Sequence, residues 1–582
     1  MRKTSNTSKK VQSCLIQKKM KLIAEKGATG GGNCICYIGL LLLIGTLLFL
    51  SSCKNTYIIP PPEIWNPSEK SFTVTFEPNL PTGVSEDKLT EMPESIEVKS
   101  GQTLDSSIAP KLADGVGYAF NGWLTAEGEA FTSDTKITSD ITLYASWIST
   151  WDGSSSDTAF YDDNPDANEY SISTAAELRG LAELVNGGND FSGKTIILEN
   201  DIDLGNHEWT PIGIAGNAFK GTFRGKTDEK TEIRNLKITN PTQVTQSSVY
   251  GAGLFGFIED AIISNLHING EIDISATDKD VRAGSVAGYV DNSVITNYEA
   301  DVHIRAKGKW AYSGGIAGYI NNTEIRSSIN NEKIEGYGFE QSQCGGIVAL
   351  VYGTSSINNC RNEGDVYAEN TPEVNGDQDG IGCMAGGIAG YQEMGSGENS
   401  ISKCTNTGNV TAKENGHNNS DAGGIVGYVL NLYNENASII ISECINDGDV
   451  LSIYNGGEFN HSQYGQYAYA AFGGGIAGTL LNYYADSAIE ISGCENYGIV
   501  RGESNAMATE LKSSAIGGIV GIIQNIQGTT NIKNNHNEGQ LSTVMDIGYA
   551  VAVVIEASPV DVSGNTDGTE QGLNEIGFIQ EM

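Results

Sequence analysis

Hydrophobic residues recur in one phrase along this chain, from about residue 250 to residue 540. Its fullest form, residues 423–450, begins Gly-Gly-Ile-Val-Gly-Tyr and ends, after a variable stretch, Ile-Ser-Glu-Cys-Ile-Asn-Asp-Gly-Asp-Val. A phrase repeated every 30 to 51 residues predicts a stack of structural repeats. Eight copies of its first half begin at residues 252, 284, 314, 345, 386, 423, 474 and 517.

Each half of the phrase predicts a short strand. A side-chain period of two places Ile425, Gly427 and Val429 on one face. Val426 and Tyr428 then lie on the other. One repeat has too little apolar surface to fold by itself, so stacked repeats would bury a continuous core. The expected fold is all-β, with a parallel β-helix whose repeats span residues 251–545.

Two columns of identical residues follow from such stacking. Equivalent residues on neighbouring coils lie about 4.8 Å apart. One column is an amide ladder, a device that stabilises stacked β structure, formed by Asn362, Asn406, Asn446, Asn496 and Asn537. The other is a column of thiols, in which His536 follows Cys360, Cys404, Cys444 and Cys494. Gly448 is expected at a corner with positive φ.

Residues 173–188 carry the clear helical pattern of the chain. Thr174 and Glu177 form a capping box, and Gly187 ends the helix. Its apolar face contains Leu178, Leu181, Ala182 and Val185. In the expected cap and first coils, residues 171–250, this face covers the open end of the solenoid and protects its strand edges.

Residues 71–148 read as a separate small β module. Phe-Thr-Val-Thr-Phe at residues 72–76 alternates as a strand does, and two tryptophans, Trp123 and Trp147, occur near later glycine corners. The segment resembles the internalin-type B repeat of bacterial surface proteins, which implies a β-grasp-like spacer domain. The tryptophans are expected in its core, with ligand stacking as the alternative. Residues 149–170 are expected to be a linker.

The segment from about 170 to 545 resembles the GLUG-motif β-helix family. The resemblance rests on the repeated phrases and on the Trp-Thr-Pro-Ile-Gly and Phe-Lys-Gly-Thr-Phe-Arg-Gly stretches that begin at Trp209 and Phe219. Similar repeats accompany surface adhesins and the non-catalytic portion of immunoglobulin A1 proteases. The resemblance implies a parallel β-helix and carries no catalytic residue across. Residues 546–582 are expected to add a last strand and a cap.

The amino terminus carries an export signal. Residues 36–50 form an apolar run that follows a basic stretch, which is typical of a signal-peptide core. The following Leu-Ser-Ser-Cys resembles the lipobox of bacterial lipoproteins and implies cleavage of residues 1–52 and diacylation of Cys53. An uncleaved anchor helix is the alternative, and Met20 is an alternative start. Residues 53–70 would form a tether, and the protein would lie in the cell envelope, at the outer-membrane surface.

Charge and cysteine usage narrow the possible partners. The formal net charge of −37 disfavours nucleic acid, and no basic cluster follows the signal segment. Six cysteines follow Cys53, and four of them occupy equivalent repeat positions from which parallel side chains cannot meet. Buried free thiols are therefore expected rather than disulfides or a zinc site.

No catalytic motif is found. His207 and Glu208 begin a zincin-like sequence without its second histidine, and no Gly-x-Ser-x-Gly elbow occurs. Arg224 with Asp201 and Asp203 is expected to be a structural ion pair. A calcium-loop-like segment contains Asn375, Asp377 and Asp379, but it lacks the closing glutamate, so it is only a weak Ca²⁺ candidate beside a plain acidic loop, and no firm cofactor follows.

Aromatic residues supply the candidate binding surface. Tyrosines at the end of the phrase would form an exposed ladder suited to a glycan or a protein: Tyr289, Tyr319, Tyr391 and Tyr428. The alternative is that long loops fold back and bury this ladder in an outer core. A second group lies in the longest insertion of the repeats: Tyr454, Tyr464, Tyr467 and Tyr469.

Three functions are compatible with this sequence. The first is a non-catalytic adhesin or ligand-binding protein, bound to a glycan or to a surface protein of a host or neighbouring cell. The second is a polysaccharide-cleaving β-helix enzyme, and the third is a structural display element. An enzyme requires two carboxylates about 5–10 Å apart beside a cleft, whereas a binding protein does not.

Overall fold

The computed structural model describes residues 70–581, apart from positions 82, 106, 227–229, 240–248, 372–381, 394, 396, 417, 432–435, 456–470, 505–513, 543–545, 549, 557, 559, 570 and 572. The chain divides into two compact units, residues 1–70 and residues 71–582. The signal segment, Cys53 and the tether lie outside the described residues. Within the part of the chain that is described, no helix has the length and apolarity to cross a membrane.

The small amino-terminal domain is built on a mixed sheet. β1 (Ser71–Glu77) pairs antiparallel with β3 (Ile96–Lys99) and parallel with β7 (Ile141–Thr150). β7 also pairs antiparallel with β5 (Tyr118–Leu124), which continues to β6 (Ala130–Phe131). The short elements η2 (Glu86–Lys88), β2 (Leu89–Glu91) and β4 (Lys111–Leu112) complete the domain.

Both tryptophans of this domain serve its core. Trp123 is buried beside Val74 and Leu143, and Trp147 packs partly buried against the same cluster. Each indole N–H donates to a backbone carbonyl, from Trp123 to Ile108 and from Trp147 to Pro78. The expectation that they are core residues is confirmed.

The cap and first coils follow. The helix α4 (Ala175–Asn186) has the predicted Thr174–Glu177 capping box and ends at Gly187. Its buried face joins the solenoid core, so the predicted capping role is confirmed. The expected linker at 149–170 contains the short helix α3 (Ala159–Asp162) and a buried Trp151. The first strands of the solenoid are β8 (Glu169–Ile172), β9 (Thr195–Leu198), β10 (Ile202–Asp203), β11 (Thr222–Gly225) and β12 (Thr231–Ile238).

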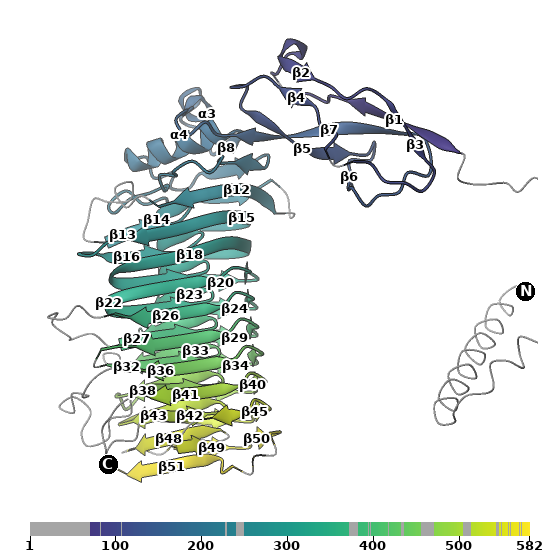
Figure 1. Ribbon diagram of the computed structural model, residues 1–582. Coiled ribbons are helices and arrows are strands. Elements are labelled where there is room, and N and C mark those ends of the chain that lie inside the picture. Colours follow the sequence, from purple (N-terminus) through teal and green to yellow (C-terminus); the bar gives the residue numbers. More distant parts are fainter. Residues whose placement is uncertain are drawn as a thin grey trace, which may run out of the picture. The chain divides into compact units, whose positions relative to one another are not determined.

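From β8 onward the paired strands named here are parallel, and Figure 1 shows the coils stacked from β12 to β51. One sheet contains the Gly-Gly-Ile-x-Gly-Tyr phrase and is called here the phrase sheet. Its strands are β14 (Phe255–Glu259), β17 (Ala287–Asp291), β19 (Ala317–Asn321), β23 (Val348–Tyr352), β28 (Ala389–Glu393), β33 (Val426–Asn431), β38 (Ala477–Asn482), β43 (Val520–Asn525), β48 (Val551–Glu556) and β51 (Ile576–Glu581).

The remaining strands of each coil belong to the large sheet. Two long strands, β15 (Ile262–Ser275) and β18 (Val294–Gly314), run through several positions of the coil. The isoleucine-bearing strands are β20 (Glu324–Arg326), β24 (Ser356–Asn358), β29 (Gly397–Ser402), β34 (Ala437–Ser442), β39 (Ala488–Ser492) and β44 (Thr529–Lys533), and β49 (Val560–Ser563) has a valine in place of the isoleucine. The asparagine-bearing strands are β21 (Ile329–Asn330), β25 (Arg361–Asn362), β30 (Thr405–Asn406), β35 (Ile445–Asn446), β40 (Glu495–Asn496) and β45 (His536–Asn537), and β50 (Thr566–Asp567) has an aspartate in place of the asparagine.

Two further series complete the coil. The strands after the asparagine are β22 (Ile334–Gly345), β26 (Val366–Asn370), β31 (Val410–Glu414), β36 (Val450–Tyr454), β41 (Val500–Ser504) and β46 (Leu541–Ser542). The strands that lead into the phrase are called here the cover strands. They are β13 (Val249–Ala252), β16 (Asp280–Ala283), the ends of β18 and β22, β27 (Gly382–Gly386), β32 (Asn419–Gly423), β37 (Ala471–Gly474), β42 (Ser514–Gly517) and β47 (Asp546–Gly548).

The predicted amide ladder is present and begins one coil earlier than expected, at Asn330. Each Asn Nδ2 donates to Oδ1 of the next asparagine at 2.8 Å, through Asn362, Asn406, Asn446, Asn496 and Asn537. The same nitrogen donates to a carbonyl two residues on, as Asn446 does to Gly448 at 2.8 Å. The ladder therefore fixes both the stacking of the coils and the corner within each coil.

The thiol column is also present. Cys360, Cys404, Cys444 and Cys494 are buried and free, as are Cys344 and Cys383. The last copy differs from the prediction, because His536 is the register partner of Glu495 at a half-buried position outside the thiol column. The cysteine position is taken by Asn535, whose Oδ1 accepts from the Cys494 N–H at 2.9 Å.

The glycines of the phrase are required by close packing. A Cβ at Gly387 would collide with the Gly424 carbonyl and with Asn406 of the ladder. Gly448 does not have the expected positive φ. A glycine is required there for another reason, because a Cβ would collide with the Gly408 carbonyl on the preceding coil. The left-handed position lies before the cysteine instead, as at Glu443, with φ of 53°.

The predicted alternation of the phrase strand is wrong at one point. Val426 packs in the main core with Ile425 and Val429, rather than on the face of Tyr428. Gly427 interrupts the alternation, since its Cα lies too close to the Gly390 carbonyl for a side chain. At the carboxyl end, strands continue through β51, so residues 546–582 add more strands than the single one expected.

Two acidic side chains are buried where the strands after the ladder meet the cover strands. Glu414 accepts from Asn370 Nδ2 at 3.1 Å and from the Gly416 N–H at 2.6 Å. Asp421 accepts from the Thr479 hydroxyl, and its Oδ2 has no hydrogen-bond partner within the described part of the chain. Burial raises the pKa of both carboxyl groups to about 8.

We predict that Asn446→Ala lowers the free energy of unfolding by about 1–3 kcal/mol, because it leaves Asn496 Oδ1 and the Gly448 carbonyl without their buried donor. Urea denaturation followed by circular dichroism measures this change. The exposed Asn409, which bonds Asp365 at the surface, supplies the control variant Asn409→Ala. Equal losses in the two variants would contradict a special role for the ladder.

We also predict that stability depends on the protonation of Asp421. Its folded pKa is raised above the unfolded value, so its contribution is complete below about pH 4 and declines as the pH rises toward about 8. Asp421→Asn should therefore gain stability relative to wild type at pH 8 compared with pH 5, by urea denaturation. The exposed Asp447→Asn should show no such difference, and a gain for Asp421→Asn that is equal at both pH values would oppose the prediction.

Candidate functional site

The phrase sheet carries a column of outward-facing side chains, and only its first part reaches the surface. In register these are Phe257, Tyr289, Tyr319, Leu350, Tyr391, Tyr428, Thr479 and Ile522. Phe257, Tyr289 and Tyr319 are half-buried, whereas Tyr391 and Tyr428 are only 2% and 3% exposed. Burial excludes direct ligand contact by Tyr391 and Tyr428, which corrects the expectation of a continuous exposed ladder.

The cover strands bury the later part of this column. Their facing residues, also in register, are Gly251, Arg282, Tyr312, Gln343, Met384, Asp421, Phe472 and Ala515. Met384, Tyr391 and Tyr428 share one buried cluster, so an outer core exists, built by strands rather than by the loops considered above. Opposite Phe257 the cover strand offers only Gly251, which leaves the ring partly open.

The open end forms a stack of rings called here the aromatic strip, namely Phe257, Tyr289, Tyr319 and Tyr352. The centroids of Tyr289 and Tyr319 lie 4.9 Å apart with planes 6° from parallel. Phe257 lies 5.6 Å from Tyr289, and Tyr352, which is 36% exposed, lies 6.4 Å from Tyr319. The faces of Tyr289 and Tyr319 therefore cover each other, and ring edges and hydroxyl groups are left for a ligand.

One arginine organises the strip. The Arg282 guanidinium lies 4.5 Å from the Tyr319 centroid and 5.4 Å from the centroids of both Tyr289 and Tyr312. These distances allow cation–π attraction. Burial raises the pKa of Tyr289 and Tyr319 above the usual value, so both hydroxyl groups stay protonated and can donate hydrogen bonds.

A polar column runs beside the strip, two residues further along each strand. Glu259, Asp291 and Asn321 are in register on β14, β17 and β19. Asn321 Nδ2 donates to Asp291 at 2.8 Å, and Lys220 forms an ion pair of 2.8 Å with Glu259. Burial, with smaller contributions from neighbouring carboxylates that include Glu259, raises the pKa of Asp291.

Strip and column meet in a cleft of about 450 Å³ at the amino-terminal end of the repeats. Its walls include Asp190, Asn217, Lys220, Phe257, Glu259, Tyr289 and Asp291. Phe257 ends the stack, and among the described residues no further ring covers its other face. The cleft thus combines a half-buried aromatic ring with carboxylate, amide, ammonium and hydroxyl groups. This combination suits a polar ligand with an apolar side, such as a sugar ring or a peptide.

The other predicted site residues are not part of this cleft. Tyr464, Tyr467 and Tyr469 and the weak calcium candidate Asn375, Asp377 and Asp379 lie outside the described residues. Arg224 approaches Glu169 at 4.0 Å rather than the two expected aspartates, and Asp201 pairs with Arg234 at 3.8 Å. The sequence analysis did not identify Arg282, Glu259 and Asp291 as site residues. Glu259 and Asp291 follow the aromatic residue of their phrase by two positions, and this constant spacing could have shown that they are aligned.

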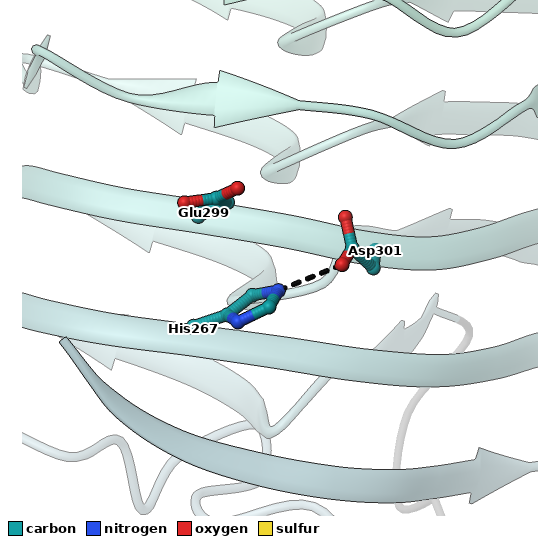
Figure 2. Close-up of side chains that lie close together, drawn as sticks. All are labelled: His267, Glu299 and Asp301. Atoms are coloured by element: carbon teal, nitrogen blue, oxygen red, sulfur yellow. Dashed lines mark hydrogen bonds and ion pairs between the residues drawn. The ribbon is translucent and has the colours of Figure 1, made fainter. Parts of the chain in front are cut away.

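Histidine and carboxylate side chains gather on the large sheet. His267 on β15 is in register with Glu299 on β18, and Asp301 lies two residues further along β18. Figure 2 shows the imidazole directed toward the two carboxylates. Their ligand atoms lie within 4.8 Å of one another, and His267 Nε2 is 2.8 Å from Asp301 Oδ2. This is the one His/Asp/Glu/Cys group within metal-binding range that the described residues contain.

Comparison with known proteins identifies one segment of the chain. Residues 72–146 match the Listeria-Bacteroides repeat domain family, which supports the expected repeat domain. Among solved structures, the chain is similar to a protein from Bacteroides ovatus proposed to be an immunoglobulin A1 protease. That similarity has 15% identity and a TM-score of 0.27, and it covers 72% of this chain and 85% of the other. No curated protein matches the sequence.

Proposed function

We propose that this protein is a non-catalytic binding protein of the cell envelope that uses the cleft beside the aromatic strip. The observation that carries the proposal is the convergence of Phe257, Tyr289, Glu259 and Asp291 on one cleft of about 450 Å³. Its ligand is a glycan or a surface protein of a host or neighbouring cell. The repeat domain at 72–146 would hold the β-helix away from the membrane.

The chemistry of the cleft favours a neutral or cationic ligand. Three carboxylates line it, and the ammonium group of Lys220 is already paired with Glu259. The chain as a whole has a net charge of −37, which repels anionic ligands at long range. A neutral sugar would find donors and acceptors at the cleft wall and an apolar face at Phe257.

Attachment to the outer-membrane surface through Cys53 is part of the same proposal. It is supported by the sequence, in which an apolar run of signal-peptide length leads directly to Leu-Ser-Ser-Cys. A lipid anchor would place the binding surface outside the cell and would concentrate many copies on one surface. Weak individual contacts could then act together.

A polysaccharide-cleaving enzyme is the second candidate, because Glu259 and Asp291 both line the cleft. They are register partners, so their backbones lie about one strand spacing, roughly 4.8 Å, apart. The raised pKa of Asp291 is a property of a general acid. However, the two side chains project in parallel from one face, whereas glycosidase carboxylates flank the scissile bond. The geometry therefore favours binding.

We predict that Phe257→Ala weakens ligand binding at least about tenfold, as expected for an aromatic anchor in a desolvated site. A glycan and host-protein array with the full chain identifies the ligand, and titration of the variant then measures its affinity. Tyr497→Ala removes a 41% exposed tyrosine that does not line the cleft, and this variant should bind as wild type does. Equal affinity of Phe257→Ala, with an unchanged unfolding temperature, would sink the proposal.

The two candidates differ in their response to charge removal. For a binding protein, Asp291→Asn should change affinity while neither wild type nor variant releases reducing ends from the bound glycan. For an enzyme, wild type releases them, and Asp291→Asn or Glu259→Gln abolishes the release while binding persists. A reducing-end assay on the ligand from the array separates these outcomes, and release by wild type would refute the non-catalytic assignment.

A further inference from the structure

A second surface, on the large sheet and away from the cleft, bears the side chains shown in Figure 2. From His267, Glu299 and Asp301 we infer a binding site for a divalent transition-metal ion of the Zn²⁺ type. One imidazole nitrogen and two carboxylates form a donor set that suits such ions, whereas Mg²⁺ and Ca²⁺ prefer oxygen ligands alone. The inference is independent of the function proposed for the cleft.

The backbone already places these ligands. His267 and Glu299 are register partners on adjacent parallel strands, and Asp301 shares the face of Glu299 two residues later. Around a tetrahedral Zn²⁺ the ligand atoms lie about 3.3 Å apart. The ligand atoms of the three side chains now lie between 2.8 Å and at most 4.8 Å apart. Side-chain movements of about 1 Å therefore bring all three groups to a metal ion.

The surroundings orient the ligands as the outer shell of a metal site does. His267 Nδ1 faces Glu232 Oε1 at 4.0 Å, and Asn269 holds that oxygen with a bond of 2.9 Å. A metal ion at Nε2 would replace the present Nε2–H···Asp301 hydrogen bond, and the ring proton would then lie on Nδ1, which faces Glu232. Asn331 Nδ2 donates to both metal-facing carboxylates, at 3.1 Å to Glu299 and 2.7 Å to Asp301.

The two carboxylates of the site attract cations, and one positively charged side chain of the protein already lies beside them. The Lys230 ammonium forms an ion pair with Glu299. Lys230 has a long flexible side chain, so a divalent ion can displace it toward water, where its charge is solvated. The three ligands are between 24% and 38% exposed, which leaves the outer side of the metal open to water ligands. Lys230 therefore competes with the metal.

The same strand provides a matched control. His303 on β18 contacts Glu335 Oε2 at 3.0 Å, and among the described residues it does not belong to a group of three ligands. If His267 made only a surface contact with a carboxylate, His267→Asn and His303→Asn should have the same effect on metal binding. If His267 is a metal ligand, only His267→Asn should weaken that binding.

Isothermal titration of the purified full chain with Zn²⁺, Mn²⁺ and Ca²⁺, without an affinity tag, tests the inference. Zn²⁺ should saturate one site whose affinity falls at least about tenfold in His267→Asn and in Asp301→Asn. His303→Asn should leave that site unchanged. Lys230→Ala should tighten it, because the competing ammonium group is gone.

The outcomes that would overturn the inference are specific. They are the absence of saturable Zn²⁺ binding, Ca²⁺ binding as tight as Zn²⁺ binding, or equal loss of binding in His267→Asn and His303→Asn. Circular dichroism of each variant establishes that the solenoid is intact. Co²⁺ supplies a second readout, because its visible absorption reports nitrogen and oxygen ligands directly and should disappear in His267→Asn.

Discussion

From Asn330 to Asn537, each coil of this β-helix must lie on the previous one with the asparagine amides in hydrogen-bond contact, and the rest of the structure depends on this constraint. The amide of Asn406 spans from Asn362 to Asn446, and a Cβ on Gly387 would occupy the same space. The ladder and the glycines therefore depend on each other. The glycines leave space for the asparagine amides, and the hydrogen bonds of the amides fix the register of the coils. A shift of one residue would turn every core side chain outward.

Because the coil is fixed so tightly, functional variation is confined to columns of outward-facing residues. The aromatic column is half-buried where the cover strands contribute Gly251, Arg282 and Tyr312, and it is buried where they contribute Met384 and Asp421. The tyrosines at the end of the phrase therefore belong to the surface in the first coils and to the outer core in the later ones. The cleft lies at the end of the repeats where the cover strands pack least completely on the phrase sheet.

The repeat pattern alone was sufficient to predict the β-helix, the asparagine ladder, the buried thiols and the capping helix, since each depends on a local signal or on stacking of equivalent residues. It could not predict which tyrosines are exposed, because Tyr319 and Tyr428 occupy the same position of the phrase. Their difference arises from residues on another sheet. The role of Gly448 was likewise misjudged, because a close contact between coils leaves no mark in one copy of the phrase.

A rigid register also explains how polar side chains can be placed for binding without loops. His267 and Glu299 approach each other because their strands are hydrogen-bonded neighbours, and Glu259 and Asp291 are aligned for the same reason. Little conformational entropy is then lost when a ligand binds. Parallel projection from one sheet, however, gives side chains that act on a ligand from a single side. Such an arrangement suits capture of a cation or a sugar better than cleavage of a bond between two opposed groups.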